Sequence, residues 1–175
     1  EALEEMSDAS GTLWLDTGRR DWSDRMLAAT GLDRSQMPAL VEGSQPAGRM
    51  RPELARELGF DAPPLFAGGA GDNAAGAVGL GTVDPGSSFL SLGTSGVLWR
   101  TTAGFEPRAG NAVHAFCHAL PGRWHQMSVH LSAAASLSWW SSISGQSEAA
   151  LLGEPGAQID RPSPAIFTPY LSGER

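Results

Sequence analysis

The chain has 175 residues and a formal net charge of −7, from 12 basic and 19 acidic residues. All 12 basic residues are arginine, which excludes a Walker-type phosphate loop, a protein kinase site and a pyridoxal enzyme, because each needs a lysine. The negative charge and the absence of a basic cluster argue against nucleic acid and against an anionic membrane as partners. The single cysteine, Cys117, excludes an internal disulfide and favours a cytoplasmic location.

Short elements are predicted in the first part of the chain. The residues before Leu13 have no periodic pattern and are expected to form a loop, followed by a strand over Leu13–Leu15. Asp21 is placed to be the N-cap of a helix over Trp22–Thr30. The apolar face of this helix would consist of Trp22, Met26 and Ala29.

Two α/β domains are predicted, with a boundary in the turn-rich segment 81–87. The first, 1–81, contains a helix that begins at Pro52, a strand over Leu65–Ala67 and a helix from Asp72 to about Leu80. The second, 82–175, begins with strands and continues with helices. Its strands are expected at 88–92, 97–101, 112–120 and 127–131, and its helices at 132–143, with Leu137 and Trp140 facing the core, and at 148–152.

The strongest local motif is the run from Gly68 to Ala77, in which Gly71-Asp72-Asn73 lies between a strand and a helix. Glycines let a ligand approach the backbone closely, and ligands of open α/β sheets bind at the carboxyl ends of strands. This placement favours a catalytic or metal-linked role for Asp72. The alternative is that Asp72 is only the N-cap of the helix.

A second motif, Gly93-Thr94-Ser95-Gly96, lies at the turn of the expected hairpin. Such a turn can offer backbone N–H groups and two hydroxyls to a phosphate without a cation. An ordinary hairpin turn is the alternative. It is not a nucleophile elbow, because Gly-x-Ser-x-Gly would need glycine at Val97.

The four histidines and the cysteine gather between residues 114 and 130, which raises the question of a zinc site. Their spacing matches no common zinc pattern, and buried strand histidines are the favoured interpretation. His114 and His118 would share one face of a strand, with Cys117 on the other. Tryptophans that could stack on a base are assigned to the core or to a domain interface, namely Trp99, Trp124, Trp139 and Trp140.

Seven stretches of the chain match sequence motifs of one protein family. They are Met6–Asp16, Arg20–Asp24, Gln36–Leu40, Gly71–Gly79, Leu90–Gly96, His114–Pro121 and Pro169–Arg175. In these stretches the chain resembles the FGGY family of carbohydrate kinases, over nearly its whole length. The resemblance implies an α/β architecture of the actin/RNase H-like ATPase type. The chain would comprise the C-terminal part of the sugar-binding domain and the opening part of the ATP-binding domain. The stretches at Met6 and His114 point to members that act on xylulose.

This resemblance implies ATP-dependent phosphorylation of D-xylulose to D-xylulose 5-phosphate, with Mg²⁺ and with a possible homodimer as the assembly. Asp72 matches the catalytic base, and Asn73 and Gly71 match sugar-contacting positions. Gly93, Thr94 and Ser95 match the hairpin that holds the ATP phosphates. Domain closure is expected to bring base and phosphates together and to exclude water. No metal ligand is assigned within the chain.

The family's Asp-x-Gly-Thr hairpin for Mg²⁺ and its adenosine motif are absent from the chain, which is therefore expected to be an inactive segment of a longer kinase. Two other functions stay open at this stage. One is a different FGGY sugar or polyol kinase, and the other is a non-catalytic actin-like module that binds nucleotide. Loss of turnover in an Asp72→Ala variant would separate the kinases from the binding module.

Overall fold

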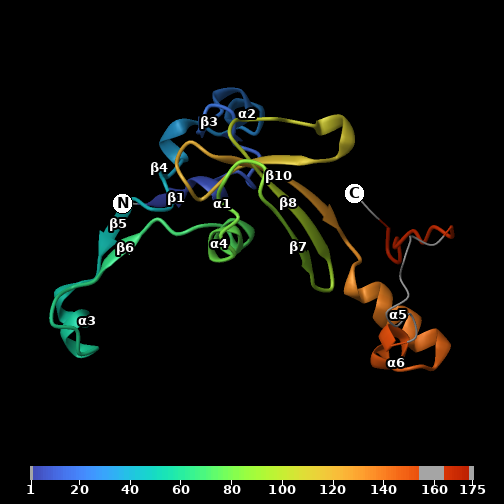
Figure 1. Cartoon of the computed structure of the whole chain (residues 1–175). Helices are drawn as coiled ribbons and strands as arrows, with labels where there is room; N and C mark the ends of the chain where they lie inside the picture. The colour runs from blue at the N-terminus through green and yellow to red at the C-terminus, as the bar shows by residue number, and fades with distance from the viewer. Residues whose placement is uncertain (1, 154–163, 174–175) are drawn as a thin grey trace. The chain divides into compact units, whose positions relative to one another are not determined.

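The computed structural model describes residues 2–153 and 164–173, so Glu174 and Arg175 of the last motif lie outside the described residues. The chain divides into two compact units (Figure 1). Unit 1 comprises residues 1–89 and 99–127, and unit 2 comprises residues 90–98 and 128–175. The predicted domain boundary near residue 81 stays a prediction, because these units describe packing within this chain alone.

Short strands and helices make up both units. The strands are β1 (Leu3–Glu5), β2 (Leu15–Asp16), β3 (Asp21–Trp22), β4 (Ala39–Val41), β5 (Pro46–Arg49), β6 (Leu65–Ala67), β7 (Ser88–Leu92), β8 (Gly96–Thr102), β9 (His114–Cys117) and β10 (Trp124–His130). The helices are α1 (Met6–Ala9), α2 (Asp24–Ala29), α3 (Pro52–Glu57), α4 (Asp72–Gly79), α5 (Ala134–Ser144) and α6 (Glu148–Gly153), with 3₁₀ turns at Arg34–Gln36 and Ala109–Asn111. The structure therefore mixes helix and sheet, as expected.

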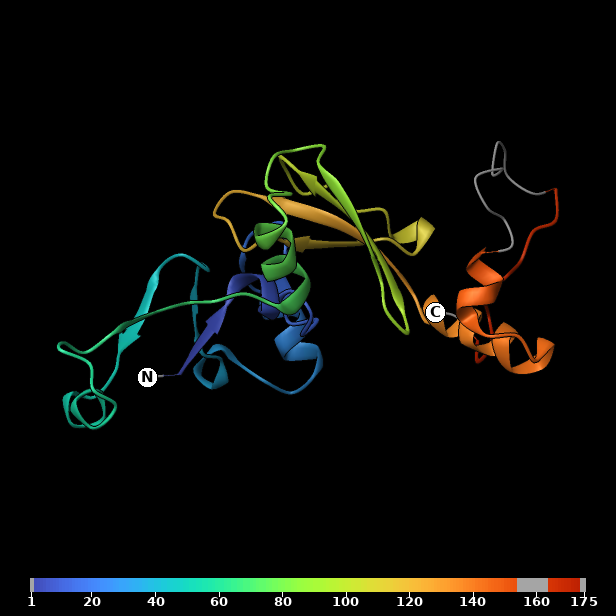
Figure 2. The same ribbon diagram turned by 60° about the horizontal axis from the view of Figure 1, so that its bottom comes forward.

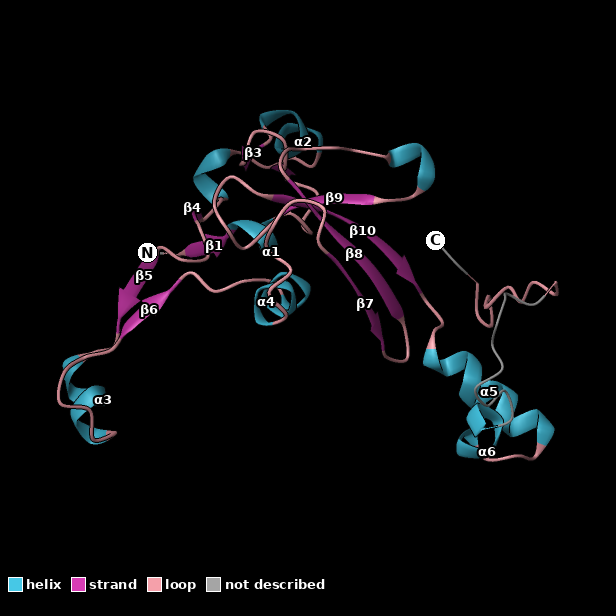
Figure 3. Cartoon of the chain, in the orientation of Figure 1, coloured by secondary structure: helices cyan, strands magenta, loops and turns pink. Residues whose placement is uncertain are grey.

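The largest sheet has four strands in the order β7-β8-β10-β9 (Figure 3). The antiparallel pairing of β9 with β10 places His125 opposite Phe116 and Met127 opposite His114. Two-stranded pairs elsewhere join β1 to β4 in parallel, and β2 to β3 and β5 to β6 antiparallel. The pairing of β5 with β6 brings the strand before the Gly-Asp motif against residues 46–49.

The core of unit 1 is built from side chains of α1, β2, β3, α2 and β9. Its buried members are Met6, Ala9, Leu15, Trp22, Leu27 and Cys117. The Trp22 indole N–H donates to the Pro38 carbonyl at 2.9 Å, which satisfies the polar end of this buried ring. At the edge of the core, Arg20 pairs with Glu42, and both side chains are less than a fifth exposed.

Several predicted elements are confirmed with nearly the expected bounds. Pro52 begins α3, where its missing N–H costs nothing, and β6 leads through glycines into α4. The predicted hairpin is present as β7 and β8. The strand predicted at 112–120 is shorter, and the one predicted at 127–131 begins earlier, at Trp124.

Three local predictions are wrong. The stretch before Leu13 is not a loop, because Glu5 caps α1 by accepting the N–H groups of Ser7 and Asp8. The second helix begins at Asp24 with Ser23 as its N-cap, since Asp21 and Trp22 pair with β2. Because α2 begins later than predicted, its inward face also differs from the predicted one. The buried residue of α2 is Leu27.

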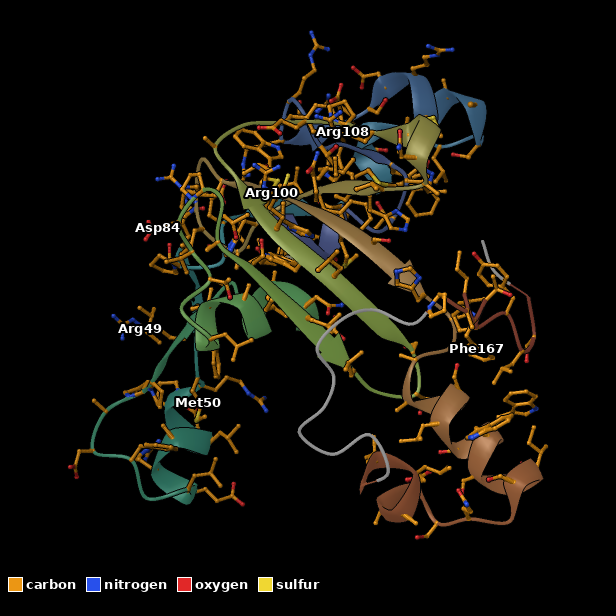
Figure 4. All side chains as sticks on the ribbon, turned by 45° about the vertical axis from the view of Figure 1, so that its right-hand side comes forward. Arg49, Met50, Asp84, Arg100, Arg108 and Phe167 are labelled. Carbon is orange, nitrogen blue, oxygen red and sulfur yellow. The ribbon has the colours of Figure 1, made fainter. Side chains whose placement is uncertain are left out.

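The side-chain environment of α5 also differs from the prediction. The residues of α5 are not buried in this structure, and Trp140 is 49% exposed. Within unit 2, Phe167, which is labelled in Figure 4, follows α6 in the chain. Its ring stacks on Trp139 with ring centroids 5.9 Å apart. None of the helices in residues 2–153 and 164–173 is long and apolar enough to cross a lipid bilayer.

Candidate active site

The chain approaches α4 through a loop of glycines, and packing explains part of this glycine run. A Cβ at Gly68 would lie 2.5 Å from the Glu42 carbonyl oxygen, which is too close for any side chain. Gly69 has φ +90°, a left-handed conformation that favours glycine. Two of the glycines are therefore required by the fold itself, before any ligand is considered.

Gly71, rather than Asp72, is the N-cap of α4, and no side chain within the helix caps it. Asp72 is therefore not the N-cap residue, and its catalytic role stays a prediction. Asp72 is the first helical residue, and its side chain is exposed. Its Oδ1 accepts hydrogen bonds from the Asn73 backbone N–H at 2.7 Å and from Asn73 Nδ2 at 3.1 Å. No hydrogen bond from a described residue reaches Oδ2, which leaves this oxygen available to a substrate.

Asp72 opens on a cavity of about 120 Å³ within unit 1. Three parts of the chain line it. They are Ser7, Asp8 and Gly11 around α1, then Gly71, Asp72, Asn73 and Ala74, and finally Phe116, His125 and Met127 from β9 and β10. The structure thus brings together the three predicted residues 71–73. It adds Asp8, Phe116 and His125, whose motifs were identified in the sequence without a site role.

His125 is the most enclosed titratable group at this cavity, with 2% of its surface exposed. Its ring stacks on Trp99 at 3.5 Å between centroids, and neither ring nitrogen has a hydrogen-bond partner among the described residues. Burial lowers the pKa of His125 to about 3, with smaller lowering by His118 and His114 and an opposing effect of the Cys117 carbonyl. The ring is therefore neutral at physiological pH.

Of the other side chains in this cluster, Cys117 and His118 are buried, His114 is half-buried and His130 is exposed, so the predicted burial of the histidines is wrong for His130. His118 is fully buried, its Nδ1 accepts the Leu120 N–H at 3.1 Å, and burial lowers its pKa. Cys117 points into the core of unit 1, on the other side of the chain. Among residues 2–153 and 164–173, no group of three or more His, Cys, Asp or Glu side chains is arranged to hold a metal ion. The zinc interpretation therefore has no support in this part of the chain.

The second candidate region, the turn between β7 and β8, belongs to unit 2. The Gly93 N–H donates to the Ser95 carbonyl at 2.9 Å. The Thr94 carbonyl accepts from the Ala133 and Ala135 N–H groups, and the Gly93 carbonyl accepts from the Ala134 N–H. The turn is thereby attached by its backbone to the start of α5. The N–H and hydroxyl groups of Thr94 and Ser95 have no hydrogen-bond partner among the described residues, so they can donate hydrogen bonds to a ligand.

A larger cleft, of about 630 Å³, lies around α2 and contains none of the predicted site residues. One of the guanidinium groups that line it, from Arg34, bridges Asp21 at 3.0 Å and Asp24 at 2.5 Å. These side chains are about half exposed or more, so the cleft is a solvated charged surface.

Comparison with known proteins agrees with this architecture. A family model described as the FGGY family of carbohydrate kinases, N-terminal domain, matches residues 1–79. The chain is 53% identical to the xylulose kinases of Klebsiella pneumoniae and Escherichia coli (strain K12), over 100% of this chain and 36% of each relative. A crystal structure of a xyloylose kinase from Brucella ovis superposes with a TM-score of 0.94 at 55% identity, and covers 100% of this chain and 36% of that one.

More distant structures share the fold alone. A gluconate kinase from Lactobacillus acidophilus has a TM-score of 0.83 at 20% identity, over 99% of this chain and 36% of that one. The fold class expected from the sequence, the actin/RNase H-like ATPase fold of sugar kinases, is confirmed by these neighbours. Residues 1–79 match the family model for the N-terminal domain of FGGY carbohydrate kinases, and the chain is similar to xylulose kinases along its whole length. It spans about a third of the length of these relatives.

Proposed function

We propose that the protein transfers the γ-phosphoryl group of ATP to D-xylulose and forms D-xylulose 5-phosphate and ADP. The observation that carries the proposal is the exposed Asp72 carboxylate, which lines a small cavity and whose Oδ2 has no hydrogen-bond partner among the described residues. The 53% identity to proteins named xylulose kinase supports this choice of sugar.

Asp72 is proposed as the general base. The sugar hydroxyl on C5 attacks the γ-phosphorus, its proton passes to Asp72 Oδ2, and the bond to the ADP oxygen breaks. Because the transition state of phosphoryl transfer is loose, the base contributes mainly by position. Asn73 holds Oδ1 of Asp72 through its amide N–H₂, so its amide oxygen is free to accept a sugar hydroxyl. Gly71 allows the sugar to approach the backbone.

Thr94 and Ser95 are proposed to bind the phosphates of ATP through their unpartnered N–H and hydroxyl groups. Gly93 is not proposed to donate its N–H to a phosphate, because this N–H already donates to the Ser95 carbonyl within the turn. Mg²⁺ prefers carboxylates together with waters and substrate phosphates. Among the described residues no group of three or more His, Cys, Asp or Glu side chains is arranged to hold a metal ion, and a role for Mg²⁺ in this protein stays a prediction.

The domain assignment belongs to this proposal. Residues 1–81 would be the end of the sugar-binding domain and residues 82–175 the opening of the ATP-binding domain. A cytoplasmic location and a homodimer remain predictions of the same kind.

Release of ADP tests the proposal in the full-length gene product, with D-xylulose compared with other ketoses, gluconate and glycerol. We expect a strong preference for D-xylulose and a fall in kcat of about 10³-fold in Asp72→Asn. Asp61→Asn is the matched control, since Asp61 is also exposed but lies in a distant loop. Thr94→Val and Ser95→Ala should raise the KM for ATP.

The outcomes separate the alternative functions. Preference for another sugar would assign the protein to a different FGGY kinase with the same base. Nucleotide binding without any turnover in the wild type would indicate a non-catalytic module. Full turnover in Asp72→Asn would contradict the assignment of the base.

A further inference from the structure

The start of α4 is attached to the N-terminal part of the chain by one side chain, Ser7 of α1. The Gly71 N–H donates to Ser7 Oγ at 3.0 Å, across 64 residues of sequence. Figure 2 shows α1 and α4 side by side, as the hydrogen bond requires. Both segments belong to unit 1.

Ser7 is in turn held by Glu5. The Ser7 hydroxyl donates to Glu5 Oε2, and the same oxygen accepts the N–H groups of Ser7 at 2.9 Å and Asp8 at 3.1 Å. Glu5 and Ser7 are each 6% exposed, so water does not compete effectively for these bonds. A hydroxyl has one proton, and Ser7 commits it to the carboxylate. Its lone pairs are thereby turned toward Gly71.

This attachment is important because the N-cap residue of α4 makes no side-chain hydrogen bond to the helix. Gly71 is the N-cap and has no side chain to accept the N–H groups of the first turn. Asp72 is fixed to the helix by Asn73, and the helix start is fixed to the rest of unit 1 through Ser7. The position of the Asp72 carboxylate therefore depends on the Ser7 hydroxyl.

We propose that Ser7, oriented by Glu5, is a positioning residue for the base Asp72. The inference rests on the proposed kinase function. Ser7 also lines the cavity, but its hydroxyl is already used by Glu5 and Gly71, so it acts through the helix start. Small displacements of a reacting group slow catalysis strongly, by up to about 100-fold for 1 Å.

Ser10 provides a matched control within the same segment. Its hydroxyl donates to the Met6 carbonyl at 3.0 Å and accepts the distant Cys117 N–H at 3.0 Å, and it is 3% exposed. Ser7 and Ser10 thus make the same kind of buried bridge, but only Ser7 reaches the start of α4. Loss of either hydroxyl should lower stability, with the larger loss for Ser7, because Ser7 donates to a carboxylate and Ser10 to a backbone carbonyl.

The experiment compares Ser7→Ala, Ser10→Ala and Asp72→Asn in the full-length gene product, by kcat, the KM for each substrate and the melting temperature. We expect kcat to fall at least 10-fold further in Ser7→Ala than in Ser10→Ala, with the KM for ATP unchanged. Glu5→Gln, which keeps an acceptor oxygen, should give a smaller fall. If Ser7→Ala does not fold, Ser7→Cys keeps a side chain with a weaker acceptor and should show the same split.

Different results would contradict the positioning role of Ser7 and the assignment of Asp72 as the base. Equal kcat values in the two serine variants, with Asp72→Asn inactive, would overturn the positioning role and leave the base in place. Full activity in Asp72→Asn would overturn the base itself. An increased KM for ATP in Ser7→Ala with kcat unchanged would also contradict the positioning role.

Discussion

The two candidate site regions are held in place by different kinds of contact. The start of α4 depends on a side chain, Ser7, and on the close approach of glycine backbones. The turn at Gly93–Ser95 is attached to the start of α5 by backbone hydrogen bonds. Removing the Ser7 side chain should therefore displace the proposed base. The turn at Gly93–Ser95 should move only when a larger residue is placed beside it.

The largest effect on stability is expected from Gly43→Ala, beside the glycine loop that leads to the proposed base. A Cβ at Gly43 would lie 2.5 Å from the Gly69 carbonyl oxygen and 2.6 Å from the Ala119 carbonyl oxygen. Both contacts are with backbone, which cannot rotate away, so we expect a loss of about 3 kcal/mol in the free energy of unfolding. Urea unfolding of the full-length protein measures it. Gly104→Ala is the control, since no described atom lies near that position. A stable Gly43→Ala variant would show that this loop adapts.

Lowering the pH should destabilise unit 1, which contains both the start of α4 and His125. The pKa of His125 is about 3 in the folded protein and about 6.5 in an unfolded chain. Between these values the unfolded chain binds the additional proton, so stability is complete above pH 6.5 and falls as the pH decreases. The loss is about 2 kcal/mol at pH 5. Burial lowers the pKa of His118 as well, which acts in the same direction.

Unfolding in urea at pH 7 and pH 5 measures this effect. His125→Phe keeps a ring against Trp99 and should remove most of the difference between the two pH values. If the difference is unchanged in this variant, His125 is not its source.

The smallest effect on stability is expected from Gly96→Ala, directly after the turn at Gly93–Ser95. A Cβ there would lie 3.0 Å from the Ala133 Cβ, so the turn would be pushed from the start of α5. We expect a loss of about 1 kcal/mol in stability and a higher KM for ATP, with the KM for the sugar unchanged. Enzyme assays and urea unfolding measure both. A change confined to the KM for the sugar would mean that the turn does not contact ATP.

Elements with local signals were predictable from the sequence. Pro52 sets the start of α3, the glycines after Ala67 end β6, and the hairpin turn needs only its own residues. The same local signals marked Asp72 as a candidate, because a carboxylate between a strand and a helix is recognisable without a partner, whereas Asn73 was assigned through the family resemblance. The seven family stretches indicated the fold, which the structural neighbours confirm.

Elements that depend on distant partners were not predictable. Asp21 is a suitable N-cap in isolation, but pairing of β2 with β3 and the salt bridge to Arg34 use it otherwise. Glutamate is an uncommon N-cap, so the cap of α1 by Glu5 has no clear sequence signal.

The sequence by itself excluded the classes that need a lysine and marked the Gly-Asp-Asn junction and the Gly-Thr-Ser turn as candidate sites, since composition and short motifs can be read without the fold. Only the tertiary structure decided that Ser7 holds the start of α4 and that His125 lies buried beside Asp72 in one cavity. The physical reason is that hydrogen-bond partners and burial are set by residues far apart in the chain, which local propensity does not encode.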